Sequence, residues 1–157
     1  MLRFEGNRRF DLSPQETFAK LTDARFLVPC VPDVESVRSL DADRAEMVLR
    51  PRFAFVRGTL DATMRILDPV ADSSVRVEIT GKGIGSSSEI HATLTFAPSE
   101  TGTNIHWAAD VKALGGLLKL VPAGLIRGAA EKVINDAWNR IEKTLTQERL
   151  TLSEPEA

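Results

Sequence analysis

The chain has 157 residues, of which 43% are apolar and 27% are charged, and its formal net charge is −2. This length suits a single domain with a substantial core, and the near-neutral charge excludes the basic surface typical of nucleic-acid-binding proteins. The lone cysteine, Cys30, excludes an internal disulfide and favours a reducing compartment.

The N-terminal stretch MLRFEGNRRF carries charged side chains where a secretory signal has an apolar region. No apolar run in the sequence reaches the roughly 18 residues that a membrane-spanning helix needs. The sequence therefore predicts a cytoplasmic protein, with any membrane contact limited to the inner face.

The first part of the chain predicts one strand and two short helices. Apolar and charged residues alternate over residues 2–10, which is the period of a strand. In the stretch DLSPQETFAKL, Ser13 is a favourable N-cap and Glu16 completes a capping box. Asp23 is expected to cap a second short helix, which Pro29 and the following proline end.

The middle of the chain predicts a series of antiparallel strands. From Val34 onward, apolar residues recur at every second position. In one predicted strand, the side chains that point to the same face are those of Met47, Leu49, Phe53 and Phe55. The next strand does the same with Leu60, Ala62, Met64 and Ile66, and the last strand with Ile105, Trp107, Ala109 and Val111.

The glycine-rich stretch GKGIG, residues 81–85, has the composition of a phosphate-binding loop. Such a loop follows a strand and opens a helix, but the residues on both sides of this stretch alternate with a period of two. The third glycine of a dinucleotide-binding fingerprint would fall on Ser86. The stretch therefore predicts a hairpin turn between two strands rather than a nucleotide site.

The turn SETGTN predicts the register of the final hairpin. With Pro98 opposite Thr103, the apolar pairs are Phe96–Ile105, Leu94–Trp107 and Ala92–Ala109, and the polar pairs are Glu89–Lys112 and His91–Asp110. The polar pairs join opposite charges across the strands. One register satisfies both faces of the hairpin, which favours this pairing.

A long C-terminal helix ends the domain. Its apolar stripe, at helical spacing, consists of Ile126, Ala130, Val133, Ile134, Ala137, Trp138, Ile141 and Leu145. One amphipathic helix on one face of an antiparallel sheet is an α+β arrangement. We therefore expect a single ligand-binding domain over residues 1–148 and a disordered tail over residues 149–157.

A sheet with one apolar face must curl to bury that face against a single helix, and such a curl often leaves a cavity for an apolar ligand. The candidate ligand-binding residues are large, apolar and directed inward: Met47, Phe53, Phe55, Met64, Leu94, Trp107, Ile134 and Trp138. The alternative, equally favoured by their spacing, is that they fill a solid core. In the alternation of their strands, Arg8 and Arg38 fall at positions whose side chains point inward. Each either extends its stem to water at a strand end or anchors a polar head group of the ligand.

Groups for catalysis or metal binding are missing from the predicted interior. The inward positions of the middle and late strands carry no carboxylate, histidine or lysine that could act as a general acid or base. Cys30 has no charged neighbour in LVPCVP, which favours an inert buried thiol. His91 and His106 lie on the polar faces of their strands. An offset of four residues along a strand separates them by about 13 Å, so no metal site is predicted. We expect no catalytic residues and no cofactor.

The segment ALGGLLKLVPAGLI, residues 113–126, is apolar but too short to span a bilayer. Two interpretations stay open: the segment packs as the start of the last helix, or it forms an apolar lip that touches a membrane. Packing is favoured because the single Lys119 gives little attraction to anionic lipids.

The order of elements resembles the START/Bet v 1-like (SRPBCC) helix-grip superfamily and, within it, the G-subunit family of carbon monoxide dehydrogenase. The resemblance rests on the stretches FDLSPQETFAKLTDARFLVPCVPDVESV, VRGTLDATMRILDP, GKGIGSSSEIHATLTF and GTNIHWAADVKALGGLLKLVPAGLI, which cover most of residues 2–145. Two departures are Pro32-Asp33, where the family commonly has Pro-Gly, and Arg50-Pro51, where Gly-Pro is usual.

The resemblance implies a seven-stranded antiparallel sheet curled around the C-terminal helix, with two short helices between strands 1 and 2. It also implies a non-catalytic protein that binds a lipid or quinone-like molecule and serves as an accessory or membrane-recruitment factor of a molybdenum hydroxylase. Two alternatives stay open. One is an enzyme resembling polyketide cyclases and dehydratases that uses the same cavity, and the other is a protein-interaction module that uses the convex face of the sheet.

Overall fold

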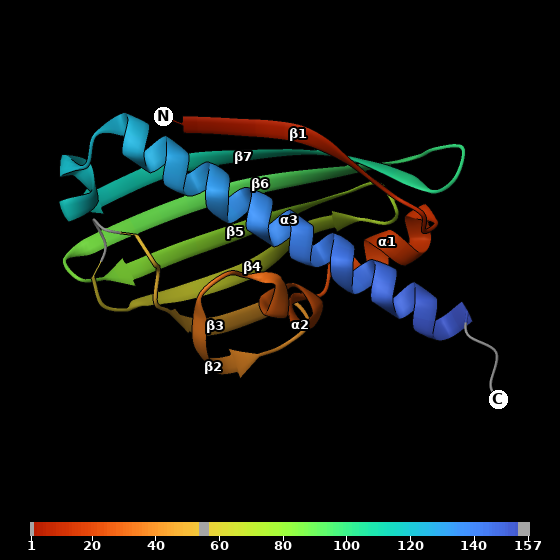
Figure 1. Ribbon diagram of the computed structural model, residues 1–157, viewed down its shortest axis with the longest axis horizontal. Coiled ribbons are helices and arrows are strands. Elements are labelled where there is room, and N and C mark those ends of the chain that lie inside the picture. The colour runs from red at the N-terminus through yellow and green to blue at the C-terminus, as the bar shows by residue number, and fades with distance from the viewer. Residues whose placement is uncertain (1, 54–56, 154–157) are drawn as a thin grey trace.

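A seven-stranded sheet and one long helix make up most of the computed structural model, which describes residues 2–53 and 57–153. The elements in chain order are β1 (Leu2–Phe10), α1 (Pro14–Leu21), α2 (Ala24–Leu27), the 3-10 helix η1 (Val28–Cys30), β2 (Val34–Leu40), β3 (Arg44–Leu49), β4 (Leu60–Val70), β5 (Ser74–Gly83), β6 (Ser86–Pro98), β7 (Thr103–Gly116), the 3-10 helix η2 (Leu117–Leu120) and α3 (Ala123–Ser153). Helix α3 lies obliquely across one face of the sheet (Figure 1). The predicted ligand residue Phe55 lies outside the described residues.

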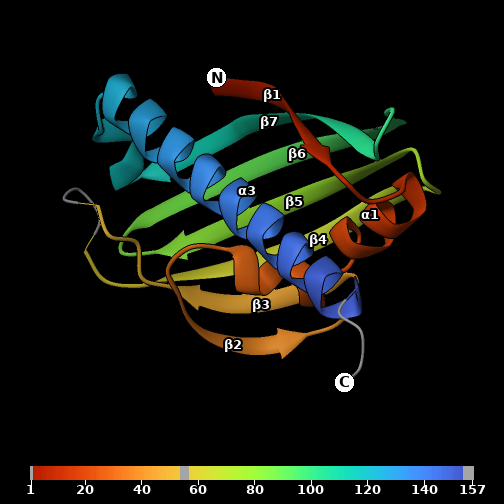
Figure 2. The ribbon, with the colours of Figure 1, turned by 45° about the vertical axis from the view of Figure 1, so that its right-hand side comes forward.

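The sheet is open and entirely antiparallel. Its strand order is β1-β7-β6-β5-β4-β3-β2, so β1 and β2 form the two edges. The turned view in Figure 2 shows the sheet bending around α3, with α1 and α2 near the C-terminal half of that helix. The predicted α+β helix-grip fold, with two short helices between the first two strands, is confirmed.

Side chains capping α1 and α2 explain why both short helices form where the sequence predicts them. The Ser13 side chain accepts a hydrogen bond from the Glu16 backbone N–H at 3.1 Å, and Asp23 accepts one from the Arg25 backbone N–H at 2.9 Å. These bonds satisfy backbone donors that have no partner inside the helix. Pro29 does not end the second helix directly, because the chain continues through it as η1.

Both predicted late hairpins form. Strands β5 and β6 are joined by Ile84 and Gly85, whose φ angles are +55° and +66°, as a type I′ turn requires. The GKGIG stretch is therefore a hairpin turn, as predicted.

The final hairpin has the predicted register up to a β-bulge. His91 lies opposite Asp110, but the register shifts after Ile90, which pairs with Val111. Glu89 consequently lies opposite Ala113, and the predicted pairing of Glu89 with Lys112 is wrong. The extra residue in β7 could not be seen from the alternation of side chains, because a bulge changes the pairing of two strands rather than the composition of one.

The predicted third-strand extension is also wrong. Strand β3 ends at Leu49, and Phe53 follows it in an irregular segment instead of sharing a strand face with Met47. Pro51 has no backbone N–H to donate to a ladder, which explains why the strand does not continue.

The core lies between the inner face of the sheet and the helices. Met47 and Val75 from the sheet are buried together with Leu21 from α1. From α3, the predicted stripe supplies the buried residues Ile126, Trp138, Ile141 and Leu145. Val133 departs from the prediction, since it stays 37% exposed.

The cap of α2 gives a prediction about acid stability. The Arg25 guanidinium, hydrogen-bonded to Asp23 at 2.9 Å, holds the pKa of the Asp23 carboxyl below its usual value. Because the folded pKa lies below the unfolded one, this stabilisation is present above the unfolded pKa and is lost as the pH falls through the folded pKa. We expect Asp23→Ala to lower the free energy of unfolding by about 1 kcal/mol at neutral pH, and the difference from the native chain to shrink below about pH 4.

Urea unfolding at pH 7 and at pH 3 measures this difference. Asp23→Asn is the matched control, because asparagine also caps helices well but does not titrate. A deficit of Asp23→Ala that is equally large at both pH values would contradict the assignment.

Candidate functional site

An apolar cavity of about 220 Å³ lies between the sheet and the N-terminal half of α3. Every described residue that lines it is apolar. From the sheet and the segment before β4 they are Phe4 (β1), Pro51 and Phe53 (between β3 and β4), Leu60 (β4), Ile90 (β6), and Ala109, Val111 and Leu114 (β7). From the helices they are Leu118 (η2) and Ile126, Ala129, Ala130, Val133 and Ile134 (α3). The cavity predicted from the curled sheet is therefore present.

Small residues on α3 keep this space open. Ala129 and Ala130 stand at the part of the helix that faces the cavity, between the larger Ile126 and Ile134. Their side chains end at Cβ, so they fill little of the volume that leucine would fill at the same positions. Helical spacing places all four on the side that faces the sheet.

The β-bulge in β7 directs the far end of the strand toward the cavity. Ala109 and Val111 reach it from alternate positions, as strand geometry requires. The extra residue after Val111 shifts by one position which side chains of β7 point inward. Leu114 therefore lines the cavity too. The bulge therefore forms part of the site and extends the apolar wall toward η2.

The volume of the cavity limits what it can hold. Drug-sized ligands occupy pockets of about 300–1,000 Å³, whereas an apolar cavity of about 150 Å³ is enough for benzene. At about 220 Å³, the described space accommodates a single ring or a short acyl segment.

The predicted ligand residues fall into two groups. Phe53 and Ile134 line the cavity. The others do not line the cavity but belong to the core cluster or pack against it: Met47, Met64, Leu94, Trp107 and Trp138. Trp138 lies between Phe10 and Trp107, with ring centroids 6.2 and 6.1 Å away. Periodicity identified the inward face correctly, but it could not separate residues that fill space from residues that border it.

Neither predicted arginine reaches the cavity. Arg8 contacts α3, where its Nη1 lies 3.5 Å from Asn139 Oδ1 and 3.7 Å from Glu142 Oε2. Arg38 forms an exposed ion pair with Asp61 at 3.1 Å. Each charge already has an acidic partner on the protein.

A second cavity, of about 260 Å³, adjoins the apolar one because Phe53 and Val133 line both. It is polar, and its described lining residues are Pro32, Asp33, Arg52, Phe53, Lys132, Val133, Asp136 and Arg140. The sequence interpretation missed this cavity. The available signal was the four-residue spacing of Lys132, Asp136 and Arg140, which places three charges along one side of a helix.

Asp33 shapes this polar cavity at a position where the family that the sequence resembles is expected to have glycine. Its φ is +64°, in the left-handed region that glycine favours and that aspartate tolerates better than most residues. Its carboxylate accepts a hydrogen bond from Arg52 Nε at 2.8 Å. The departure from Pro-Gly thus keeps the turn and adds an acidic side chain to the cavity wall.

The apolar segment over residues 113–126 both packs and remains exposed. Leu114 and Leu118 line the apolar cavity, whereas Leu117, Leu120 and Leu125 are 56%, 79% and 54% exposed. Part of the segment therefore packs against the sheet, and three of its leucines stay exposed. Among the described residues, no helix is both long and apolar enough to cross a membrane.

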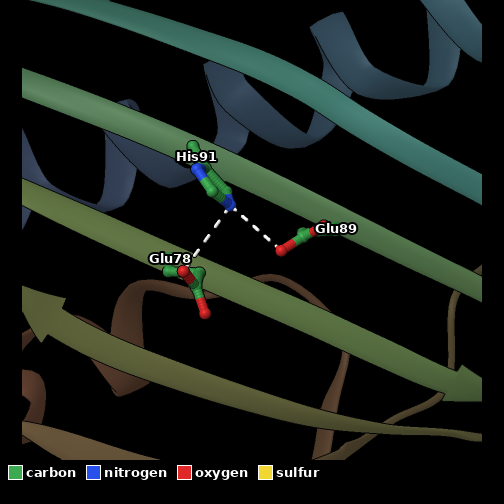
Figure 3. Close-up of side chains that lie close together, drawn as sticks. All are labelled: Glu78, Glu89 and His91. Carbon is green, nitrogen blue, oxygen red and sulfur yellow. Dashed lines mark hydrogen bonds and ion pairs between the residues drawn. The ribbon is translucent and has the colours of Figure 1, made fainter.

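Within the described residues, one group of three side chains offers ligand atoms close enough to hold a metal ion (Figure 3). Glu78 on β5 and Glu89 on β6 both approach His91 Nε2, at 3.5 and 3.2 Å. They occupy the face of the sheet opposite α3, because the neighbouring Val77 and Ala92 face the core. The sequence paired His91 with Asp110, and the strand register agrees, but the side chain turns toward β5 instead. One hydrogen bond, between His91 Nε2 and Glu89 Oε1 at 3.2 Å, joins two members of the group, and Glu78 approaches the same nitrogen from the neighbouring strand.

Comparison with known proteins identifies one family. The model of the CoxG family, described as the G subunit of carbon monoxide dehydrogenase, matches residues 6–146. No curated protein matches the chain.

Solved structures agree on the fold. A conserved protein from Geobacillus kaustophilus superposes with a TM-score of 0.81 at 20% identity, covering 93% of this chain and 96% of that one. The AHSA1 protein from Silicibacter pomeroyi gives a TM-score of 0.64 at 14% identity, covering 94% and 99%. A START superfamily protein from Mycobacterium smegmatis gives 0.61 at 8% identity, covering 92% and 97%. At these identities the likeness shows the fold alone.

The distinction between core and cavity wall can be tested with Met47 and Ile134. Met47 is only 1% exposed, so we expect Met47→Ala to lower the free energy of unfolding by about 2–5 kcal/mol and to leave the affinity for an apolar fluorescent probe unchanged. Ile134→Ala, at the cavity wall, should change the probe affinity. Urea unfolding and probe titration measure the two effects. Equal weakening of probe binding by both variants would show that ligands reach Met47.

Proposed function

Because this chain belongs to the CoxG family of carbon monoxide dehydrogenase, we propose that it binds a hydrophobic ligand in the cavity between the sheet and α3 without acting on it chemically. Both the family and the START-like fold indicate a ligand-binding domain. The ligand is a lipid or a quinone-like molecule, and only its apolar ring or a short acyl segment enters the cavity.

The observation that carries this proposal is the composition of the cavity wall. Every described lining residue is apolar, so affinity comes from the transfer of apolar surface out of water, worth roughly 25 cal/mol per Å². The cost of immobilising the ligand reduces this gain. A wall of this kind selects for size and apolarity rather than for a pattern of hydrogen bonds.

The enzyme alternative finds less support. A cyclase or dehydratase needs a side chain that can donate or accept a proton within reach of its substrate. The described wall of the apolar cavity offers none, and Arg8 and Arg38, the two arginines that could have served there, are paired elsewhere. The geometry therefore favours binding over catalysis.

The biological role we propose is that of an accessory factor for a molybdenum hydroxylase of the carbon monoxide dehydrogenase type. Membership of the CoxG family supports this role. In this accessory role, the domain delivers or holds a hydrophobic molecule for the redox enzyme and contacts the membrane surface from which that molecule comes.

Exposed leucines beside the cavity support the membrane contact. Leu117, Leu120 and Leu125 project into solvent, while Leu114 and Leu118 of the same segment line the cavity. Leu117 and Leu120 lie three residues apart in η2, and a contiguous exposed apolar patch marks a site that another apolar surface covers. A bilayer in contact with these leucines would lie next to the cavity, so a lipid-soluble ligand could pass between them with little exposure to water.

Filling the cavity tests the binding proposal. We expect native mass spectrometry of the freshly purified chain to show a bound hydrophobic molecule, and Ala130→Leu to lose it. Leucine would take up part of the space that the ligand fills, so the affinity for an apolar probe should fall roughly tenfold, which corresponds to about 1.4 kcal/mol. Ala123→Leu is the matched control, because Ala123 is exposed on the same helix. A native chain that carries no ligand and takes up no probe would refute the proposal.

Vesicle binding tests the membrane contact. We expect Leu120→Ser to weaken cosedimentation with phosphatidylglycerol-containing vesicles about tenfold, since full burial of one leucine is worth about 1.5–3 kcal/mol. Leu40→Ser is the control, because Leu40 is also exposed, at 41%, but lies on the edge strand β2. If both variants bind as well as the native chain, the leucines do not form the contact.

A further inference from the structure

The charges of the polar cavity do not balance. Arg52 Nε lies 2.8 Å from Asp33 Oδ1, and Lys132 Nζ lies 3.2 Å from Asp136 Oδ2. These two ion pairs account for four of the five charged residues among the described lining of the cavity, and the fifth is Arg140. This lining therefore has one excess positive charge, located on α3.

Arg140 has hydrogen-bonding capacity to spare. Among the described residues it forms no ion pair, and its one hydrogen bond is donated by Nη1 to the backbone oxygen of Val31 at 3.4 Å. A guanidinium has five N–H donors in a planar fork. This fork matches two oxygens of a carboxylate or a phosphate. An anion in the polar cavity would thus meet an excess charge and further donors on one side chain.

The polar cavity adjoins the apolar one. Phe53 and Val133 border both, so a ligand that lies across these two side chains would reach both spaces. Along α3, Ala130 lines the apolar cavity and Arg140 lines the polar one. Ten residues of helix correspond to about 15 Å, which is the distance along α3 between the apolar wall at Ala130 and the guanidinium-bearing residue Arg140.

We propose that the ligand is an elongated amphiphile with an anionic head group, a carboxylate or a phosphate monoester, which Arg140 holds while the chain lies in the apolar cavity. This inference rests on the proposed binding function and specifies its ligand class. It assigns to Arg140 the anchoring role that the sequence left open for Arg8 and Arg38. Those two arginines pair with Glu142 and Asp61, neither of which lines the apolar or the polar cavity. Arg140 lines the polar cavity and, within the part of the chain that the structure describes, has no acidic partner.

Ligands that share a chain and differ in the head group test this assignment. We expect decanoate and decyl phosphate to bind the native chain about tenfold more tightly than decanol, because hydrogen bonds to ionised groups are stronger than neutral ones. Displacement of an apolar fluorescent probe measures all three affinities. Arg140→Gln should abolish the preference and leave decanol binding unchanged, and Arg140→Lys should retain part of it, since lysine keeps the charge but not the fork.

Lys143→Gln is the matched control, because Lys143 is an exposed cation on the same helix and does not line the cavity. It should keep the full preference, and thermal unfolding of each variant verifies that the fold is intact. Equal binding of the three ligands by the native chain would overturn the head-group assignment and leave the binding function standing. Failure of all three to bind would refute the binding function itself. A preference that survives in Arg140→Gln would refute the role of Arg140, and binding of only one of the two anions would identify the head group.

Discussion

Burial of the inner face of the sheet against α3 is the interaction that organises everything else in the molecule. Toward the C-terminal half of the helix, Trp138, Ile141 and Leu145 fill the space between the two layers. Toward its N-terminal half, Ala129 and Ala130 do not. The same packing that holds the helix in place therefore also produces the cavity, because large side chains at one end fix a spacing that small side chains at the other end cannot fill.

Two different environments meet along one side of α3. The apolar cavity ends where Val133 and Phe53 border the polar one, and Arg140 lies at the far end of the polar space. The ion pairs of Asp33 and Asp136 neutralise the other cations of that space. A single helix thus provides both an apolar wall and a charged anchor, and a ligand lying along it would be oriented as well as bound.

The position of the exposed leucines gives this orientation a direction. Leu117 and Leu120 lie in η2, next to the wall residue Leu118. The polar cavity lies further along α3, toward its C-terminus. An amphiphile with its chain in the apolar cavity and its head group at Arg140 would therefore direct its apolar end toward these leucines.

Short-range patterns in the chain were enough to predict most of the elements, the caps of the two short helices and most of the register of the final hairpin. These features are local: Ser13 and Asp23 bond to backbone groups two or three residues away, and period-two alternation fixes which face of a strand is buried. The seven-stranded sheet curled around the C-terminal helix was implied by the resemblance of this sequence to a known family.

Which apolar residues border space and which fill it depends instead on how the elements pack. Met47 and Ile134 were both expected to point inward, but one lies in the core and the other at the cavity. The bulge after Val111, the excess charge at Arg140 and the approach of Glu78 to His91 likewise depend on residues distant in sequence. The spacing of residues along one element records which way a side chain points, but not how far away its neighbours on other elements lie, and that distance sets both packing and charge balance.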